Sequence, residues 1–319
     1  MRALVTGAAG FVGQWLSRAL LAEGWDVTGV SLEPRPARPV LTPAELDAVH
    51  WSAVDLRQPD VWGALCDDAR PDAIFHLAGV AFVPAAGSDP TAAWRANTLP
   101  MVGLLAALAP RVAGGTLDPA VVVVGSAEQY GAHPPDQQPL REDAALLPRT
   151  VYAATKVAQE VAALQAHRAH GIRVIATRPF NHSGPGQAAD FLLPALVRRA
   201  LALRASGGGE LPLGNLTPIR DFSHVADVAA AYLALARRGT PGAVYNIASG
   251  IGTSVAALAQ LVLERTARAA VPVPDPALQR TVDVPMLVGD PTKLRADTGW
   301  VPTRDVSAIL EDLINAQAD

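Results

Sequence analysis

Residues 1–13 read MRALVTGAAGFVG and combine an apolar stretch, closely spaced glycines and the start of an amphipathic segment. Residues 1–6 predict a short buried strand, and the apolar periodicity from Phe11 to Glu23 predicts a helix. The three glycines of this stretch are Gly7, Gly10 and Gly13. In a strand–turn–helix unit, glycines at this spacing permit a tight turn, the approach of a pyrophosphate to backbone amides, and close helix packing. The stretch therefore predicts a dinucleotide-binding site, with an ordinary strand–turn–helix as the alternative.

The composition is that of a globular protein. Half of the 319 residues are apolar, 18% are charged and the formal net charge is −4, so we expect neither nucleic acid nor an anionic membrane as a partner. The single cysteine, Cys66, excludes an intramolecular disulfide and a cysteine-rich metal site, and we expect it to be a buried small hydrophobe. No apolar run reaches the ~18 residues of a membrane span. Because the chain enters the glycine turn at once, we expect a cytoplasmic protein without a signal peptide.

Further apolar segments extend the first unit into an α/β fold. Strands are predicted at 26–30, 51–54, 72–79, 121–124, 172–177 and 242–248, and helices at 92–108, 152–170, 227–237 and 253–267. The fully apolar run Val121–Val124 is typical of a central parallel strand that is buried on both faces. We predict a Rossmann-type doubly wound parallel sheet in residues 1–177. Residues 178–319 are predicted to form mainly a smaller C-terminal substrate-binding lobe, with some segments returning to the sheet.

The end of the second predicted strand bears on the choice of cofactor. An NAD-preferring site usually ends this strand with an acid that binds the adenosine ribose hydroxyls, but this strand ends at Ser31. Arg35 and Arg38 follow within reach of a ribose 2′-phosphate, so we favour NADP(H). NAD(H) stays possible because Glu33 can replace the missing acid. Since the segment is rich in proline, solvated surface charge is the alternative role of both arginines.

Polar and small residues end the next two strands. Asp55, followed by Leu56, can bond the adenine amino group or cap a helix that begins near Pro59. The fourth strand ends in residues past which a cofactor can lie, Leu77, Ala78 and Gly79. We expect His76, within that strand, to be a core histidine and not a catalyst.

Tyr152 and Lys156 lie four residues apart in a predicted helix and so face the same way. A nearby ammonium group lowers the pKa of a phenol from its usual ~10 towards the operating pH, where proton transfer is efficient. Ser126 follows the buried strand Val121–Val124 and can hydrogen-bond a substrate carbonyl beside the phenol. Tyr-x-x-x-Lys alone occurs often by chance. Together with the glycine turn and Ser126, it predicts a catalytic site.

These motifs resemble the extended short-chain dehydrogenase/reductases, which act mainly on nucleotide-linked sugars. The resemblance covers essentially the whole chain and includes Asn97 and the segment Arg178–Asn181. It implies catalytic roles for Ser126, Tyr152, Lys156 and Glu128. It implies cofactor contacts from Gly7, Gly10, Phe11, Val12, Gly13, Ser31, Arg35, Asp55, Leu56, Leu77, Ala78, Gly79, Asn97, Tyr152, Lys156 and Phe180.

The C-terminal half is similar to the family members that reduce GDP-linked 4-keto-6-deoxyhexoses. The similarity lies in residues 178–187, 214–222 and 283–290. It implies substrate contacts from Ser126, Asn181, Leu193, Asn215, Arg220 and Arg280. A planar guanidinium suits the diphosphate, although surface charge is the alternative role of the two arginines. The reaction implied is the NADPH-dependent reduction of the C4 ketone of a GDP-4-keto-6-deoxyhexose.

Glu128 keeps other reactions open. In the sugar 4,6-dehydratases of the family, a glutamate two positions beyond the serine removes the C5 proton, and Glu128 stands at that position. Dehydration or epimerisation is therefore the alternative to reduction, unless Glu128 only orients substrate hydroxyls. A second departure is Gly79, where the family usually has alanine. A catalytically silent nucleotide-binding protein is the non-enzyme alternative, but the intact serine, tyrosine and lysine argue against it.

The resemblance also implies a homodimer. Many family members dimerise through two helices per subunit, and the segments 92–108 and 152–170 are the candidates because both have small apolar faces. The alternative is that these faces pack on the sheet. We predict a GDP-linked sugar as the small-molecule partner and no metal site.

Overall fold

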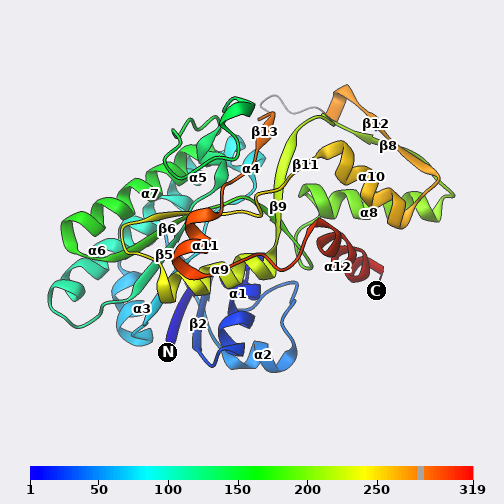
Figure 1. Ribbon diagram of the computed structural model, residues 1–319. Coiled ribbons are helices and arrows are strands. Elements are labelled where there is room, and N and C mark those ends of the chain that lie inside the picture. Colours follow the sequence, from blue (N-terminus) through cyan, green and yellow to red (C-terminus); the bar gives the residue numbers. More distant parts are fainter. Residues whose placement is uncertain (279–283, 319) are drawn as a thin grey trace.

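The computed structural model describes residues 1–278 and 284–318 (Figure 1). Seven parallel strands form the main sheet in the order β10-β6-β5-β4-β1-β2-β3. They are β1 (Arg2–Thr6), β2 (Asp26–Ser31), β3 (Val49–Ala53), β4 (Ala73–His76), β5 (Ala120–Val124), β6 (Arg173–Pro179) and β10 (Val244–Ile247). The prediction of a doubly wound parallel sheet is confirmed. The strand order reverses between β1 and β4, and such reversals are where open α/β sheets bind ligands.

Helices cover both faces of this sheet. One face carries α1 (Phe11–Ala22), α9 (Val225–Arg238) and α11 (Thr292–Thr298), and the other carries α3 (Val61–Ala69), α6 (Leu99–Ala113) and α7 (Val151–His170). The central strand β5 is fully apolar because helices cover both of its faces. Val122 packs in the core beneath α1 and α9, whereas Val121 and Val123 pack in the core beneath α3 and α6. After residue 178, therefore, β10, α9 and α11 all lie in the layers of the main sheet.

A second lobe is built from short strands and three helices. Its strands are β7 (Asn181–Ser183), β9 (Ile219–His224), β11 (Gly252–Ser254) and β13 (Met286–Leu287), with β8 (Gly209–Leu213) and β12 (Ala270–Pro274) as a separate pair. Its helices are α8 (Leu192–Ala205), α10 (Val255–Thr266) and α12 (Val306–Ala318). Figure 1 shows these three helices together, on the side of the molecule away from α6 and α7. They share one hydrophobic core of their own.

The remaining elements are short. They are α2 (Pro43–Ala48), α4 (Val83–Ser88), α5 (Pro90–Asn97) and the 3₁₀ turns η1 (Ala127–Tyr130), η2 (Pro135–Gln137) and η3 (Pro276–Leu278). The helix predicted over 92–108 is confirmed except at Thr98, where a short break divides it into α5 and α6. Pro100 lies in the first turn of α6, and a proline there starts a helix more readily than it continues one.

The helical segment Pro90–Ala113 contains an 18-residue stretch with a mean hydropathy of 1.2, and 39% of that stretch is buried. Among the described residues, it is the one helical segment that is long and apolar enough to cross a membrane. No segment of this kind was predicted from the sequence. The core helix of a soluble protein meets the same criterion. Here α6 packs on α3 and α7.

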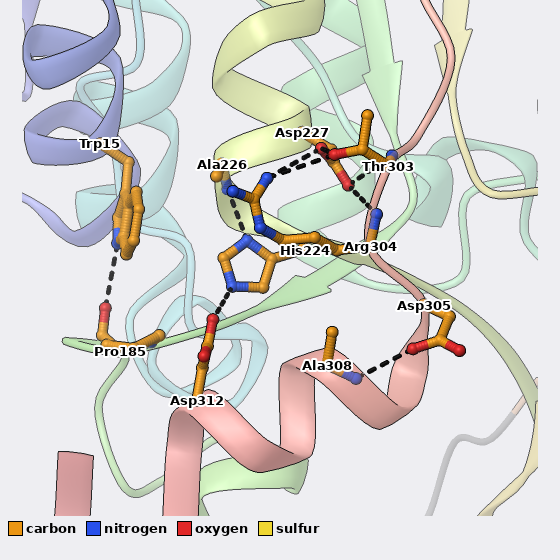
Figure 2. A network of polar contacts seen from close by, with 10 residues as sticks. All are labelled: Trp15, Pro185, His224, Ala226, Asp227, Thr303, Arg304, Asp305, Ala308 and Asp312. Carbon is orange, nitrogen blue, oxygen red and sulfur yellow. Dashed lines mark hydrogen bonds and ion pairs between the residues drawn. The ribbon is translucent and has the colours of Figure 1, made fainter. Parts of the chain in front are cut away.

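Polar contacts tie the C-terminal segment to both lobes (Figure 2). The Asp227 carboxylate on α9 accepts hydrogen bonds from the backbone amides of Thr303 and Arg304, at 3.1 and 2.9 Å. His224 Nδ1 accepts from the amide of Ala226, so its Nε2 carries the proton and donates to Asp312 of α12 at 3.1 Å. These bonds hold α12 against the end of β9 and the start of α9.

Candidate active site

The glycine turn after β1 packs too closely for side chains. Gly7 has φ +71°, its amide donates to Val30 O at 2.7 Å, and a Cβ on it would lie 2.9 Å from Ala78 N. A Cβ on Gly13 would overlap the Gly7 carbonyl, so only glycine lets α1 pack against the turn. Gly10 is the N-cap of α1, whose first amides have no intrahelical acceptors. The turn therefore fits an anionic dinucleotide phosphate.

The end of β2 is fastened to this turn. The Ser31 hydroxyl accepts a hydrogen bond from Ala9 N at 2.9 Å. Arg35 lies on the surface, where its guanidinium pairs with Asp47 at 3.1 Å and both side chains are more than half exposed. An exposed pair of this kind contributes little to stability. Arg35 can therefore turn to a bound phosphate at small cost.

Asp55 and Leu56 follow β3 at the same edge. Hydrogen bonds from the Arg57 side chain, at 2.7 and 2.8 Å, hold the pKa of Asp55 below its usual value. The alternative that Asp55 caps the next helix is wrong, because the N-cap of α3 is Asp60. Leu56 is buried in the core beneath α3 and α6.

The loop after β4 is fixed by Asn97. This fully buried side chain accepts from Val80 N at 2.7 Å and donates to Thr155 Oγ1 of α7 at 2.9 Å. A Cβ on Gly79 would lie 2.7 Å from Asn97 Oδ1, which explains why this chain has glycine here. The backbone of Leu77 and Ala78, just before, is bonded to Thr6.

Two residues set aside in the sequence are confirmed as core residues. His76 is fully buried with Nδ1 3.0 Å from Thr6 Oγ1, and burial, helped by the charge of Lys156, lowers its pKa to about 3. Cys66 is buried, and burial raises the pKa of its thiol to about 11. Neither group is suited to proton transfer or nucleophilic attack at neutral pH.

Ser126, Tyr152 and Lys156 meet where β5 ends and α7 begins. Ser126 follows β5 and is the N-cap of η1, and Thr150 caps α7 by accepting from Ala153 N at 3.1 Å. Three of the four predicted catalytic side chains, Ser126, Tyr152 and Lys156, are buried, with exposed fractions of 9%, 8% and 4%. The fourth, Glu128, is half-buried. Ser126 lies close enough to Tyr152 to act on the pKa of its phenol. Strand, turn and helix therefore bring a hydroxyl pair and an ammonium group together.

The charges of this cluster differ from the sequence prediction. Burial raises the pKa of Tyr152 to about 12; the nearby Ser126 hydroxyl opposes this and the charge of Glu128 adds to it. Burial also lowers the pKa of Lys156 to about 8. Its ammonium donates to Val124 O at 2.9 Å and to Gln159 Oε1 at 3.1 Å. The expected lowering of the tyrosine pKa by Lys156 is therefore wrong for this structure.

Phe180 and Asn181 lie between the two lobes. The Phe180 ring is buried with its centroid 6.1 Å from that of Tyr130. Asn181, half-buried on β7, donates to Asp221 O at 3.3 Å. The structure thus places Phe180 in a small core beneath the site and Asn181 at its edge.

The other predicted substrate residues are spread over the second lobe. Leu193 is buried in the core of that lobe. Asn215 is exposed and accepts from Thr217 N at 3.1 Å. Arg220 is half-buried on β9, where its guanidinium donates to the carbonyl of Ile219 at 3.0 Å. Arg280 lies outside the described residues.

A scan of family models matches residues 3–248 to the NAD dependent epimerase/dehydratase family. The chain is 34% identical over 316 residues to GDP-6-deoxy-D-mannose reductase of Pseudomonas aeruginosa, covering 98% of this chain and 96% of that protein. The chain belongs to this family. It is also 34% identical to UDP-glucose 4-epimerase of Azospirillum brasilense, over 95% of this chain and 88% of that protein. The predicted resemblance to extended short-chain dehydrogenase/reductases is therefore confirmed.

Solved structures of the family share the whole fold. A structure of RMD from Pseudomonas aeruginosa complexed with NADPH aligns with TM-score 0.82 and 30% identity, covering 99% of this chain and 98% of that one. UDP-glucose 4-epimerase from Thermus thermophilus, complexed with NAD, aligns with TM-score 0.84 and 26% identity, covering 99% of both chains. The chain thus belongs to an NAD(P)-dependent family whose members here include reductases, epimerases and dehydratases of nucleotide sugars.

Several buried polar residues at the site of this family member were missed in the sequence. Gln159 accepts a hydrogen bond from the Lys156 ammonium. Gln129 accepts from the backbone N–H of Ser126 at 2.7 Å and donates to Glu160 at 3.0 Å. Two local signals could have found them. Ser126 and Gln129 have the spacing of a capping box, and Glu160 lies one helical turn beyond Lys156.

Proposed function

We propose that this protein reduces the C4 ketone of a GDP-linked 4-keto-6-deoxyhexose with NADPH. The observation that carries the proposal is the buried cluster of the Ser126 and Tyr152 hydroxyls and the Lys156 ammonium where β5 ends and α7 begins. It occurs in a chain that matches GDP-6-deoxy-D-mannose reductase over 98% of its length. A hydroxyl pair of this kind can bind a carbonyl oxygen and protonate it.

When bound, the cofactor supplies the hydride. Ser126 would donate a hydrogen bond to the carbonyl oxygen, which becomes more basic as negative charge develops on it. Tyr152 holds its proton at neutral pH because burial raises its pKa to about 12, and so it is suited to act as the general acid. Its proton would pass to the C4 oxygen and leave a phenolate. Lys156 would balance the phenolate charge and bind the ribose next to the nicotinamide.

The cofactor is proposed to be NADP(H). The glycine turn and the start of α1 would hold the pyrophosphate, and Asn97 would shape the loop beside it. Ser31, in place of an acid, leaves room for a 2′-phosphate that Arg35 would meet. A structural relative is complexed with NADPH, whereas others are complexed with NAD. NAD(H) is therefore the alternative that binding measurements must test.

A 4,6-dehydratase is the second candidate, and Glu128 is the observation that favours it. Its charge acts on Tyr152, so the carboxylate lies near the reacting centre. In that reaction Glu128 would remove a proton from the sugar as a general base. Tyr152 would first have to act as a base, and its raised pKa disfavours this role in the structure described here.

We also propose a cytoplasmic homodimer. Large apolar side chains that are about half exposed lie on the paired helices α5, α6 and α7: Trp94 at 41%, Leu99 at 53%, Val102 at 46% and Val161 at 58%. Exposed apolar residues gathered on neighbouring helices favour association with a second copy. Sedimentation of the protein and of a Val161→Glu variant tests this. A dimer that the variant dissociates is expected, and a monomeric parent protein would contradict it.

Three parallel incubations followed by mass spectrometry test the reaction. They contain GDP-4-keto-6-deoxymannose with NADPH, GDP-mannose with NADP⁺, and UDP-glucose with NAD⁺. We expect only the first sugar to change, by the mass of two hydrogen atoms, with equimolar cofactor oxidation. Loss of water from GDP-mannose would make the protein a dehydratase, and formation of UDP-galactose would make it an epimerase. No change in any tube would contradict the proposed substrate class.

A further inference from the structure

A chain of buried polar side chains supports the backbone of Ser126. Its first member is Gln129, which is fully buried in η1. The Gln129 amide oxygen accepts from Ser126 N at 2.7 Å, and its NH₂ group donates to Glu160 Oε2 of α7 at 3.0 Å. One side chain thus links the backbone of Ser126 to the helix that carries Tyr152 and Lys156.

The next member, Glu160, is held by an ion pair. Arg178 of β6 donates to both oxygens of Glu160, at 2.9 and 2.7 Å, and both side chains are about 95% buried. Arg178 also donates to the Tyr130 hydroxyl at 2.9 Å, and that hydroxyl donates to Asn246 at 2.7 Å. Buried polar groups that are fully paired are rigid. Two consecutive residues of η1, Gln129 and Tyr130, are therefore fixed by one arginine–glutamate pair.

The pair also decides which way the Gln129 amide faces. A carboxylate only accepts hydrogen bonds, so Glu160 requires the NH₂ group of Gln129 on its side. The amide oxygen must then face the N–H of Ser126, which only donates. A flipped amide would set two donors against each other at Ser126 and two acceptors against each other at Glu160. The Gln129 amide packs against Gly125, where an added Cβ would overlap Oε1, so this arrangement requires glycine at residue 125.

We propose that Gln129 and Glu160 are positioning residues for Ser126. Glu160 selects the amide orientation of Gln129, Gln129 fixes the backbone of Ser126, and the Ser126 hydroxyl is thereby held against Tyr152. This inference rests on the proposed ketone reduction for its kinetic test. It also makes a prediction about the folded protein that needs no substrate.

The kinetic test is a double-mutant cycle with Gln129→Met, which removes both hydrogen bonds and keeps most of the volume. In the wild type we expect kcat to fall about 10- to 100-fold, with KM and the Kd for NADPH changed less than about threefold, because a displaced group costs transition-state stabilisation. In a Ser126→Ala background the same change should cost less than about twofold, since Gln129 acts through Ser126. Equal losses in both backgrounds would overturn the proposal.

The matched control is Gln138→Met. The Gln138 amide also bridges two backbone groups, Met286 O and Val288 N, both at 2.9 Å, but it does so at the start of the second lobe. We expect its kcat to stay within about twofold of the wild type. Should Gln129→Met fail to fold, Glu160→Gln replaces it in the cycle. That variant keeps an acceptor for Gln129 and loses the charge that orients it, so we expect a loss of about 3- to 10-fold that again disappears in the Ser126→Ala background.

The substrate-free test is the amide proton of Ser126 in protein labelled with ¹⁵N-serine, assigned by its absence in Ser126→Ala. In Gln129→Met this proton should move upfield and exchange faster with solvent, because its short hydrogen bond is lost. An unchanged resonance would overturn the positioning role. If the resonance moves but wild-type protein reduces no GDP-4-keto sugar, the proposed function fails and the positioning role stands.

Discussion

The two ends of the candidate site are built differently. At the junction of β5 and α7, Ser126, Tyr152 and Lys156 are at least nine-tenths buried, and the Lys156 ammonium already donates to Val124 O. In the second lobe, Asn215 is exposed on a loop and Arg220 is half-buried near the start of β9. The chemical end is buried on folding, whereas the proposed substrate end stays accessible to solvent.

This difference has a kinetic consequence. Changes at the buried end should lower kcat, because they alter groups that act on the transition state. Changes at the exposed end should raise KM or Kd, because they remove contacts made equally before and during the reaction. Substitutions at the two ends therefore test the comparison directly.

Tyr152→Phe should have the largest effect. It removes the proton that the C4 oxygen must receive, so we expect kcat to fall about 10³-fold while the Kd for NADPH changes less than about threefold. Steady-state kinetics and cofactor fluorescence measure the two quantities. Tyr245→Phe is the matched control, because this buried hydroxyl bonds Asp297 away from the site. Similar kcat values for Tyr152→Phe and wild type would remove the tyrosine from the mechanism.

Lys156→Met tests how the buried Lys156 ammonium changes the free energy of unfolding with pH. Burial lowers the pKa of Lys156 from 10.5 to about 8 in the folded protein. Between these values the unfolded chain binds more protons than the folded one, so the wild type gains stability as the pH rises. The stability of the variant relative to the wild type should therefore fall by up to about 3 kcal/mol from pH 7.5 to 10.5. Urea unfolding across this range measures it, and a pH-independent difference would contradict the buried charge.

The sequence was a better guide to one end than to the other. Residues 1–6, the glycine turn and the Tyr152–Lys156 spacing are local patterns, and the structure has the strand, turn and helix that they predict. The strands β7, β11 and β13 contain only two or three residues each. Such segments are too short for periodicity to identify, because their pairing depends on β9, which lies elsewhere in the chain.

Side-chain directions at the buried end were also beyond the sequence. Tyr152 and Lys156 share a helix face as predicted, yet the ammonium bonds Val124 O and Gln159. Spacing along a helix gives the face but not the partner, which comes here from the end of β5. The contact between Gln129 and Glu160 spans 31 residues for the same reason. It becomes visible only when η1 and α7 are packed together.

Arg220→Ala tests the exposed end. If Arg220 binds the diphosphate, its loss should raise the KM for the GDP-linked sugar about tenfold and change kcat less than about threefold. The KM of Arg220→Lys should lie between those of the wild type and Arg220→Ala, because lysine keeps the charge and lacks the planar guanidinium. A fall in kcat at unchanged KM would instead show that Arg220 acts on the transition state, and would contradict the difference between the two ends of the site.

Arg35→Ala should have the smallest effect and the most selective one. Its partner Asp47 is 72% exposed, so the pair is screened by water and its loss leaves folding unchanged. If Arg35 meets a 2′-phosphate, the Kd for NADPH should rise about 3- to 10-fold, a difference of roughly 1 kcal/mol, while the Kd for NADH stays within about twofold. The effect should shrink as salt is added, because a surface charge is screened over about 10 Å at 0.1 M.

Arg268→Ala removes an exposed charge near the end of α10 and serves as the control. Equal weakening of both cofactors by Arg35→Ala would show that the residue does not recognise the 2′-phosphate, and any preference for NADP(H) would then have to come from Ser31 and the turn to which it is bonded.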